Sequence, residues 1–502
     1  MQNRARVKGK AGRVDTTVNV LIVGAGFAGL GMAIALRKAG MESFLVIEKG
    51  DDVGGTWRDN RYPGCACDIP SHLYSFSFDL NPEWSRMYAP QPEIWEYLRR
   101  CAKRYGVLGR VRFRTAMQEA SRDEDQRLWE VTTRDGERIR ARVLISGMGA
   151  LHVPRWPDLP GHERFRGPAF HSAAWDSGAG LEGRHVAVIG TGASAIQLVP
   201  QIAPMAGRLY LYQRTPAWIL PRLDFPIADR WKRRFARVPG LMRLFRAWLF
   251  WSLEIRVAGF LGNRWMQVQG EKMARRFLER EVADSQLRAA LTPNYAFGCK
   301  RVLISSDFYQ AVQRSNVELV TEPIVEVRER SVVTAGGAER PADVLIYATG
   351  FRATELLHGV HLAGRGGIDF HQAWRASRTA FLGITTSGFP NFFMLLGPNT
   401  GLGHNSVLLM IEAQIRYVVS CLKRIERRGY CAMELRPESQ RRFGDFLRRR
   451  LAGTVWHSGG CRSWYQDAET GENPTIWPGS VVAYRRRTRR LAAGDYIWSG
   501  KG

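Results

Sequence analysis

Two glycine-rich segments of this chain have the residue types and spacing that bind dinucleotides. The first, Gly24-Ala25-Gly26-Phe27-Ala28-Gly29, follows an apolar run at 18–23 and precedes a helix-like run at 30–38. In such a turn the first glycine permits a tight bend, the second admits a pyrophosphate, and the third lets helix and strand pack closely. The start of the helix adds unpaired N–H groups for the phosphates. We therefore expect a dinucleotide at this turn.

Glu48 sets the nucleotide preference of this first site. It ends a second predicted strand, at 44–47, about 20 residues beyond the glycines. A carboxylate in this place accepts hydrogen bonds from a ribose 2′-OH and disfavours a 2′-phosphate. The first nucleotide is therefore expected to lack a 2′-phosphate.

The second segment, Gly190-Thr191-Gly192-Ala193-Ser194-Ala195, follows an apolar strand at 185–189 and leads into a helix that ends near residue 202. Ala195 replaces the third glycine but is small enough for close packing. The next strand, 208–212, is followed by Arg214 rather than by an acid, which suits a 2′-phosphate and so NADP. The first site thus disfavours a 2′-phosphate and the second favours one. Two such sites predict an embedded flavin that takes hydride from a diffusible nicotinamide.

These turns must be positioned by two Rossmann-like lobes. Strand-like runs at 142–149 and 343–350 end in glycines and bring backbone close to a bound cofactor. The segment 222–291 is helical in pattern and rich in Trp, Phe and Arg. We predict an α/β fold with an FAD domain at 18–150 and 351–502, an NADP domain at 151–350 that contains a helical insertion at 222–291, and a disordered basic leader at 1–17.

The charge of the chain is unusual. Its 502 residues hold 73 Lys and Arg against 47 Asp and Glu, a net charge of +26. This length and composition exclude a disordered chain, a collagen and a small disulfide scaffold. The basic runs are scattered and no nucleic-acid module accompanies them, so no nucleic-acid partner is expected. The segment 241–261 is too charged to span a bilayer but is suited to weak peripheral membrane association.

Seven cysteines without a regular framework indicate a reducing compartment, the cytoplasm, and thiols that mostly pack as small apolar groups. Cys65-Ala66-Cys67 lacks the spacing of a redox-active pair. No Cys/His cluster has the spacing of a zinc site, so no metal is predicted.

The segment at 165–176 carries a more specific signal. It reads Phe-Arg-Gly-Pro-Ala-Phe-His-Ser-Ala-Ala-Trp-Asp and resembles the fingerprint of the type I Baeyer–Villiger monooxygenases, in the class B flavoprotein monooxygenase family. The matching residues of this interdomain fingerprint are Phe165, Gly167, His171, Trp175 and Asp176. N-hydroxylating and flavin-containing relatives usually have Tyr or Phe and then Lys at the last two places. The resemblance covers residues 18–490 and includes Gly54-Gly55-Thr56-Trp57, Tyr62-Pro63-Gly64 and Asp68.

The resemblance implies an enzyme that uses FAD, NADPH and O2 to convert a ketone into an ester or lactone through a C4a-peroxyflavin. The alternative is N- or S-oxygenation by a related flavin-containing monooxygenase. Arg301 matches the family's active-site arginine, which would stabilise the developing oxyanions. Asp68 matches the carboxylate that orients this arginine and compensates its charge.

The resemblance also implies roles for other residues. Lys300 and Arg214 would clamp the 2′-phosphate, and Thr191 would bind the pyrophosphate. His171 would couple nicotinamide binding to domain rotation, and Trp464 would lie on a loop over the substrate. Trp57 and Tyr62 either line the flavin pocket or belong to the core. The full cofactor-binding set is Gly24, Gly26, Phe27, Gly29, Glu48, Lys49, Gly55, Thr56, Trp57, Tyr62, Asp68, Gly190, Thr191, Gly192, Ser194, Ala195, Arg214, Thr215, Lys300, Ala348, Thr349 and Gly350. The sequence identifies neither the ketone nor the oligomeric state.

Overall fold

The computed structural model describes residues 14–467 and 469–501. Its first strand, β1 (Val14–Val23), is longer than predicted, and the expected leader at 1–17 is wrong at its C-terminal end. Residues 14–17 pair in parallel with strand β6, with Thr16 opposite Ile139, because β-branched residues here favour an extended backbone. Residues 1–13 lie outside the described part of the chain.

The first lobe is built on one large sheet with the order β17-β4-β5-β6-β1-β2-β3, and β18 pairs with β6. Its centre is parallel, since β1 lies between β2 and β6. The predicted strand at 142–149 begins and ends earlier than expected, at Arg138 and Ser146. The other strands are β2 (Phe44–Ile47), β3 (Val111–Arg112), β4 (Met117–Asp123), β5 (Leu128–Thr133), β6 (Arg138–Ser146), β17 (His361–Ala363) and β18 (Phe392–Met394).

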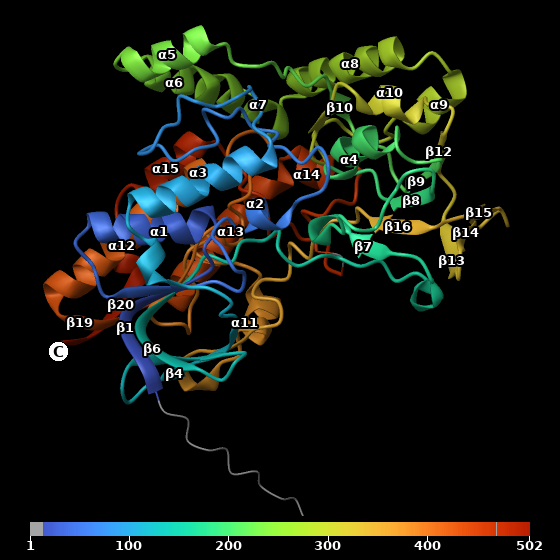
Figure 1. Cartoon of the computed structure of the whole chain (residues 1–502). Helices are drawn as coiled ribbons and strands as arrows, with labels where there is room; N and C mark the ends of the chain where they lie inside the picture. Colours follow the sequence, from blue (N-terminus) through green and yellow to red (C-terminus); the bar gives the residue numbers. More distant parts are fainter. Residues whose placement is uncertain (1–13, 468, 502) are drawn as a thin grey trace, which may run out of the picture.

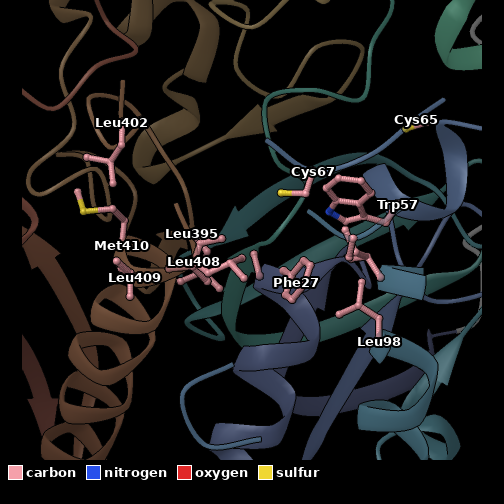
Figure 2. Close-up of a cluster of buried hydrophobic side chains, with 14 of the residues drawn as sticks. Phe27, Trp57, Cys65, Cys67, Leu98, Leu395, Leu402, Leu408, Leu409 and Met410 are labelled. Carbon is pink, nitrogen blue, oxygen red and sulfur yellow. The ribbon is translucent and has the colours of Figure 1, made fainter. Parts of the chain in front are cut away.

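Helices and a large apolar core cover this sheet (Figure 1). Helix α1 (Phe27–Lys38) packs on α12 (Leu408–Arg428), although almost 400 residues separate them. In Figure 2, Phe27 at the start of α1 lies between Trp57 and the segment that holds Leu395 and Leu408. The remaining helices of this lobe are α2 (Thr56–Asp59), α3 (Gln91–Arg104), α11 (Phe370–Ser377), α13 (Pro437–Ala452), α14 (Val455–Ser458) and α15 (Val481–Thr488), and β19 (Tyr430–Leu435) pairs with β20 (Tyr496–Lys501).

The second lobe has a parallel sheet with the order β12-β9-β8-β16-β7. Helix α4 (Ala195–Ile202) connects β8 to β9, as the second glycine turn predicts. The predicted α/β fold with two Rossmann-like lobes is confirmed. The elements are β7 (Ala169–His171), β8 (His185–Ile189), β9 (Arg208–Tyr212), β12 (Val317–Val320), β16 (Val344–Tyr347), α10 (Phe308–Val312), the pair β10 (Ile219–Leu220) and β11 (Leu303–Ile304), and the small sheet β13 (Ile324–Arg328), β14 (Ser331–Thr334) and β15 (Glu339–Pro341).

The predicted helical insertion lies at one end of the molecule, at the top of Figure 1. It consists of α5 (Asp229–Arg237), α6 (Leu241–Glu254), α7 (Val257–Phe260), α8 (Arg264–Glu281) and α9 (Ser285–Ala290). The segment 241–261 does not form one continuous helix, because the chain turns after Glu254. Gly259 and Gly262 are poor helix formers and keep α7 to about one turn. Within the described residues, no helix is both long enough and apolar enough to cross a membrane.

Candidate active site

The first glycine turn lies between β1 and α1 and has a backbone that only glycine permits. Gly24 has a φ of +99°, and a Cβ there would lie 2.8 Å from the carbonyl oxygen of Gly147. A Cβ on Gly29 would lie 1.8 Å from the carbonyl oxygen of Gly24, so helix and strand touch at this point. Gly26 caps α1 without any side-chain hydrogen bond. The first N–H groups of this buried helix end are thus left for an anion.

A second glycine pair closes over this turn. Gly54 N donates to the carbonyl of Ala25 at 2.9 Å. A Cβ on Gly55 would lie only 3.1 Å from Gly26 Cα. Because the two motifs face each other through bare backbone, they form a cradle that side chains would fill. This cradle and the uncapped helix end fit the pyrophosphate of FAD.

Glu48, at the end of β2, is 4% exposed and is held by three donors. Its Oε2 accepts from Ala25 N at 2.7 Å, and its Oε1 accepts from Gly50 N and from Arg58 Nη1, both at 2.8 Å. A carboxylate offers about four lone-pair directions, so one remains for a ribose hydroxyl. Beside this carboxylate lies a cavity of about 560 Å³ whose lining includes Lys49 and Arg58. Sequence analysis did not single out Arg58, one arginine among many.

The second glycine turn lies between β8 and α4 and packs against the end of β16. Gly190 has a φ of +109°, and a Cβ there would lie 2.6 Å from the carbonyl oxygen of Ala348. The hydroxyl of Thr191 donates to the carbonyl of Thr215 at 3.4 Å. A Cβ on Gly192 would meet nothing within 4 Å, so the backbone is open on that side. The turn therefore has the free approach that a second pyrophosphate needs.

Two cations lie close together beside this turn. Arg214 is exposed after β9, and the half-buried Lys300 has its pKa lowered by burial and by the charge of Arg214. Lys300 Nζ lies 4.9 Å from the ring centroid of Tyr295. Among the described residues neither cation forms an ion pair with a carboxylate. Two adjacent unneutralised cations fit a 2′-phosphate.

Arg301 and Asp68 are brought together from the two lobes. Arg301 Nη2 donates to Asp68 Oδ2 at 2.5 Å, and the side chains are 32% and 26% exposed. The negative charge of Asp68 raises the pKa of Arg301, although burial opposes this. Tyr465 is buried nearby, and burial raises its pKa to about 12 despite the opposing charge of Arg301. The site thus holds a permanent cation, its carboxylate partner and the neutral phenol of Tyr465, which follows Trp464 in the predicted substrate loop.

The interdomain fingerprint forms the edge strand β7 and the turn that follows. Gly167 is required there, since a Cβ would lie 2.1 Å from the carbonyl oxygen of Asp343. His171 is fully buried, and its Nδ1 accepts from Ala173 N at 3.1 Å. Its Nε2 is buried without a hydrogen-bond partner in the described chain. Burial lowers the pKa of His171 to about 4, so the ring is neutral at neutral pH.

The other fingerprint residues surround this strand. Phe165 packs at the edge of the second lobe's apolar cluster. Trp175 packs edge-to-face on Phe170, with ring centroids 5.0 Å apart. Asp176 is exposed and accepts from Gly178 N at 2.9 Å.

Trp57 and Tyr62 both lie in the apolar core of the first lobe. Trp57 Nε1 donates to the hydroxyl of Tyr74 at 3.1 Å. The hydroxyl of Tyr62 donates to Gln197 Oε1 at 3.0 Å, and Gln197 Nε2 donates to the carbonyl of Ala66 at 3.1 Å. Since Gln197 belongs to α4, these bonds join the two lobes. The sequence offered no signal for Gln197.

Five of the seven cysteines are free thiols, as predicted for most of them, but a disulfide was not expected. Cys299 and Cys461 form a disulfide across 162 positions. Both lie in or against an apolar cluster that contains Tyr465, where tertiary contacts rather than sequence spacing bring them together. The bond ties the segment before Arg301 to the loop that carries Trp464, whose side chain is 38% exposed. The free cysteines are Cys65, Cys67, Cys101, Cys421 and Cys431.

Comparisons with known proteins place this geometry in a family. Residues 17–355 match the model of the flavin-binding monooxygenase-like family. The chain belongs to this family. It is 45% identical to a Baeyer-Villiger monooxygenase of Pseudomonas aeruginosa over 477 residues, 95% of this chain and 90% of that one.

Solved structures of similar proteins support the same family. A closed crystal structure of cyclohexanone monooxygenase has a TM-score of 0.88 at 29% identity and covers 97% of this chain and 99% of its own. The cyclohexanone monooxygenase from Rhodococcus sp. Phi1 bound to NADP+ has a TM-score of 0.87 at 28% identity, with the same coverage. The chain is a Baeyer–Villiger monooxygenase that uses FAD and NADPH, as the sequence predicts, and N- or S-oxygenation is not favoured.

Proposed function

We propose that this monooxygenase binds its ketone beside Arg301 and that the guanidinium stabilises negative charge on the substrate oxygen during conversion to an ester or lactone. The observation that carries the proposal is the bond between Arg301 and Asp68. It connects residues 233 positions apart, beside a cluster of buried aromatic side chains. A fixed cation at the edge of an apolar pocket is the arrangement that oxyanion stabilisation requires.

Each partner of this pair has a separate task. Arg301 stays charged in a partly dry site because guanidinium has a high pKa, and its planar donors keep their direction. Asp68 occupies Nη2 and leaves the other donors of the fork for substrate oxygen. It also neutralises a cation whose unpaired burial would be costly.

FAD, when bound, supplies hydride acceptance and oxygen activation. The chain's own part is to hold the nucleotides and exclude water. The cradle of Gly26 and Gly55 supports FAD, and Glu48 accepts from its ribose. Arg214 and Lys300 select the 2′-phosphate of NADPH. These assignments rest on the uncapped start of α1 and on the unneutralised pair of cations.

The proposal extends to the domains and to the residues that connect or cover them. The large sheet and residues 351–502 form the FAD domain, and residues 151–350 form the NADP domain with its insertion. Neutral, buried His171 transmits nicotinamide binding between the two, and Trp464 closes over substrate. Weak peripheral membrane association, expected from the sequence, is supported by exposed apolar side chains on α6.

Product analysis tests the catalytic proposal. Purified enzyme with FAD, NADPH and O2 is given cyclic, aromatic, aliphatic and steroidal ketones and, separately, thioethers and amines. We expect ester or lactone from at least one ketone class, with NADPH consumption that rises on adding that ketone. Sulfoxide or hydroxylamine without any ester would overturn the proposal.

A further inference from the structure

The helical insertion has an outer face that the enzyme's chemistry does not use. Four apolar side chains form one stripe along α6 at spacings of four, three and four residues, the periodicity of one helix face. They are Leu244, Trp248, Trp251 and Ile255, which are 70%, 61%, 54% and 64% exposed. We call these four residues the α6 stripe. Large apolar side chains gathered on one exposed face mark an interaction surface.

The inner face of the same helix is firmly anchored, so the stripe is not the product of a loose segment. Buried Arg246 donates to the carbonyls of His72 at 2.6 Å and Ser75 at 3.0 Å. At the end of the helix, buried Glu254 accepts from Asn405 Nδ2 at 2.9 Å. Two charged side chains point inward while two tryptophans point outward. Leu249, Phe250 and Leu253 fill the core on the inner face, so α6 carries large apolar side chains on both faces and the stripe is not needed for packing.

Cations surround the stripe. Exposed Arg243 and Arg256 lie on or next to α6, and Arg264 precedes Trp265, which is 70% exposed at the start of α8. Within residues 14–467 and 469–501, no carboxylate forms an ion pair with these three arginines. The whole insertion, 222–291, holds fifteen Lys and Arg against seven Asp and Glu. Its charge therefore complements an anionic surface.

We propose that the α6 stripe docks on an anionic lipid bilayer, with its tryptophans in the interface and its arginines against the headgroups. The inference gives the peripheral association proposed above a defined surface and ligand. Tryptophan favours the boundary between water and hydrocarbon because its ring is apolar and its N–H is polar. Basic residues beside such an apolar face add attraction to anionic lipids. The insertion lies at one end of the molecule, so a flat bilayer can reach it (Figure 1).

Flotation with lipid vesicles tests the surface. Holoenzyme is mixed with phosphatidylcholine vesicles that contain none or about one third phosphatidylglycerol, at low and high salt. We expect binding to anionic vesicles at low salt and weaker binding at high salt. The variant W248S/W251S is expected to lose roughly tenfold or more in affinity, and R243Q/R256Q to lose binding mainly to anionic vesicles.

Matched controls separate the stripe from general charge. I368S removes a similarly exposed apolar side chain from another surface, and R427Q/R428Q removes two cations at the end of α12. Both should bind like the parent. Absence of anionic-vesicle binding, equal losses in the controls, or a dimer in solution that W248S/W251S converts to monomer would each overturn the proposal. Ketone oxygenation without vesicles is assayed in parallel, so failure of docking is distinguishable from failure of catalysis.

Discussion

Arg301 is the residue on which the proposed chemistry depends most. R301A removes the cation that stabilises negative charge on the substrate oxygen, so we expect ester formation to fall roughly 100- to 1000-fold. NADPH consumption should continue, because hydride transfer does not need this charge. D68N keeps the shape but not the charge of the partner and should give a smaller loss. Product chromatography beside NADPH absorbance measures both effects. R330A, at an exposed arginine elsewhere, is the control, and ester formation by R301A at the parent rate would refute the role.

Arg214 and Lys300 are the residues proposed to select NADPH over NADH. Hydrogen bonds to charged groups are each worth about 1.5 to 3 kcal/mol. R214A and K300A are therefore each expected to raise the KM for NADPH roughly 10- to 100-fold. The KM for NADH, which has no 2′-phosphate, should change little. Initial rates with both nucleotides decide the matter, and equal effects on the two would show that the pair contacts another part of the cofactor.

The sequence predicts the place of a residue well where that place follows the order of strand, turn and helix along the chain. The two glycine turns, Glu48 and Arg214 each stand at a fixed place after a strand. Arg58 was missed because nothing in the sequence distinguishes it from the many other arginines, and Gln197 because its partners lie far away in sequence. Tyr62 contacts Gln197 across 135 positions, and no local pattern encodes that contact.

At the scale of elements, the disulfide Cys299–Cys461 links the segment before Arg301 to the loop that carries Trp464. A crosslink over so long a loop restricts the unfolded chain and stabilises the fold by about 2 to 4 kcal/mol. C461S should lower the free energy of unfolding by that amount in denaturant titrations. A reductant should lower the parent's midpoint to the same extent and leave the variant unchanged. C431S, at a free cysteine, is the control. A parent midpoint insensitive to reductant would contradict the link.

The bounds of some helices and strands could be predicted from the sequence and those of others could not, for a physical reason. Strands 44–47, 185–189 and 208–212 were predicted with their observed bounds, since buried parallel strands are continuous apolar runs. The start of β1 was missed because its first residues alternate in polarity and gain order only by pairing with β6. The break after α6 was missed because Glu254 is turned inward by loops from the other end of the chain.

At the scale of the whole molecule, the cations behind the net charge of +26 have different partners and different proposed tasks. Arg58 and Arg301 pair with carboxylates, Arg214 and Lys300 are proposed to bind a cofactor phosphate, and arginines of the insertion that form no ion pair in the described chain accompany an exposed apolar stripe. Several polar contacts join the first lobe and the insertion, among them those of Arg246 with the carbonyls of His72 and Ser75 and of Glu254 with Asn405. This junction makes the assembly sensitive to acid.

His72 lies at that junction, and its protonation should loosen the insertion. Its ring is 1% exposed, packs on Phe235 and Phe245, and has neither nitrogen hydrogen-bonded within the described chain. Burial, and then the charge of Arg246, lowers its pKa from 6.5 to about 4. The unfolded chain therefore binds this proton at higher pH than the folded chain does. The contribution of His72 to the free energy of unfolding is fully present above pH 6.5. It is lost as the pH falls from there through the folded-state pKa of about 4.

We expect this histidine to contribute about 3 kcal/mol to the loss of stability on acidification, in line with a shift of its size. Thermal unfolding between neutral pH and the folded-state pKa measures the loss. H72F places an apolar ring among the phenylalanines and should flatten the acid side of the profile. H457Q, at an exposed histidine, should leave the profile unchanged. If the stability of H72F fell as steeply at acid pH as that of the parent, the acid sensitivity would be assigned to His152 and His171. Burial also lowers the pKa values of these two residues to about 4.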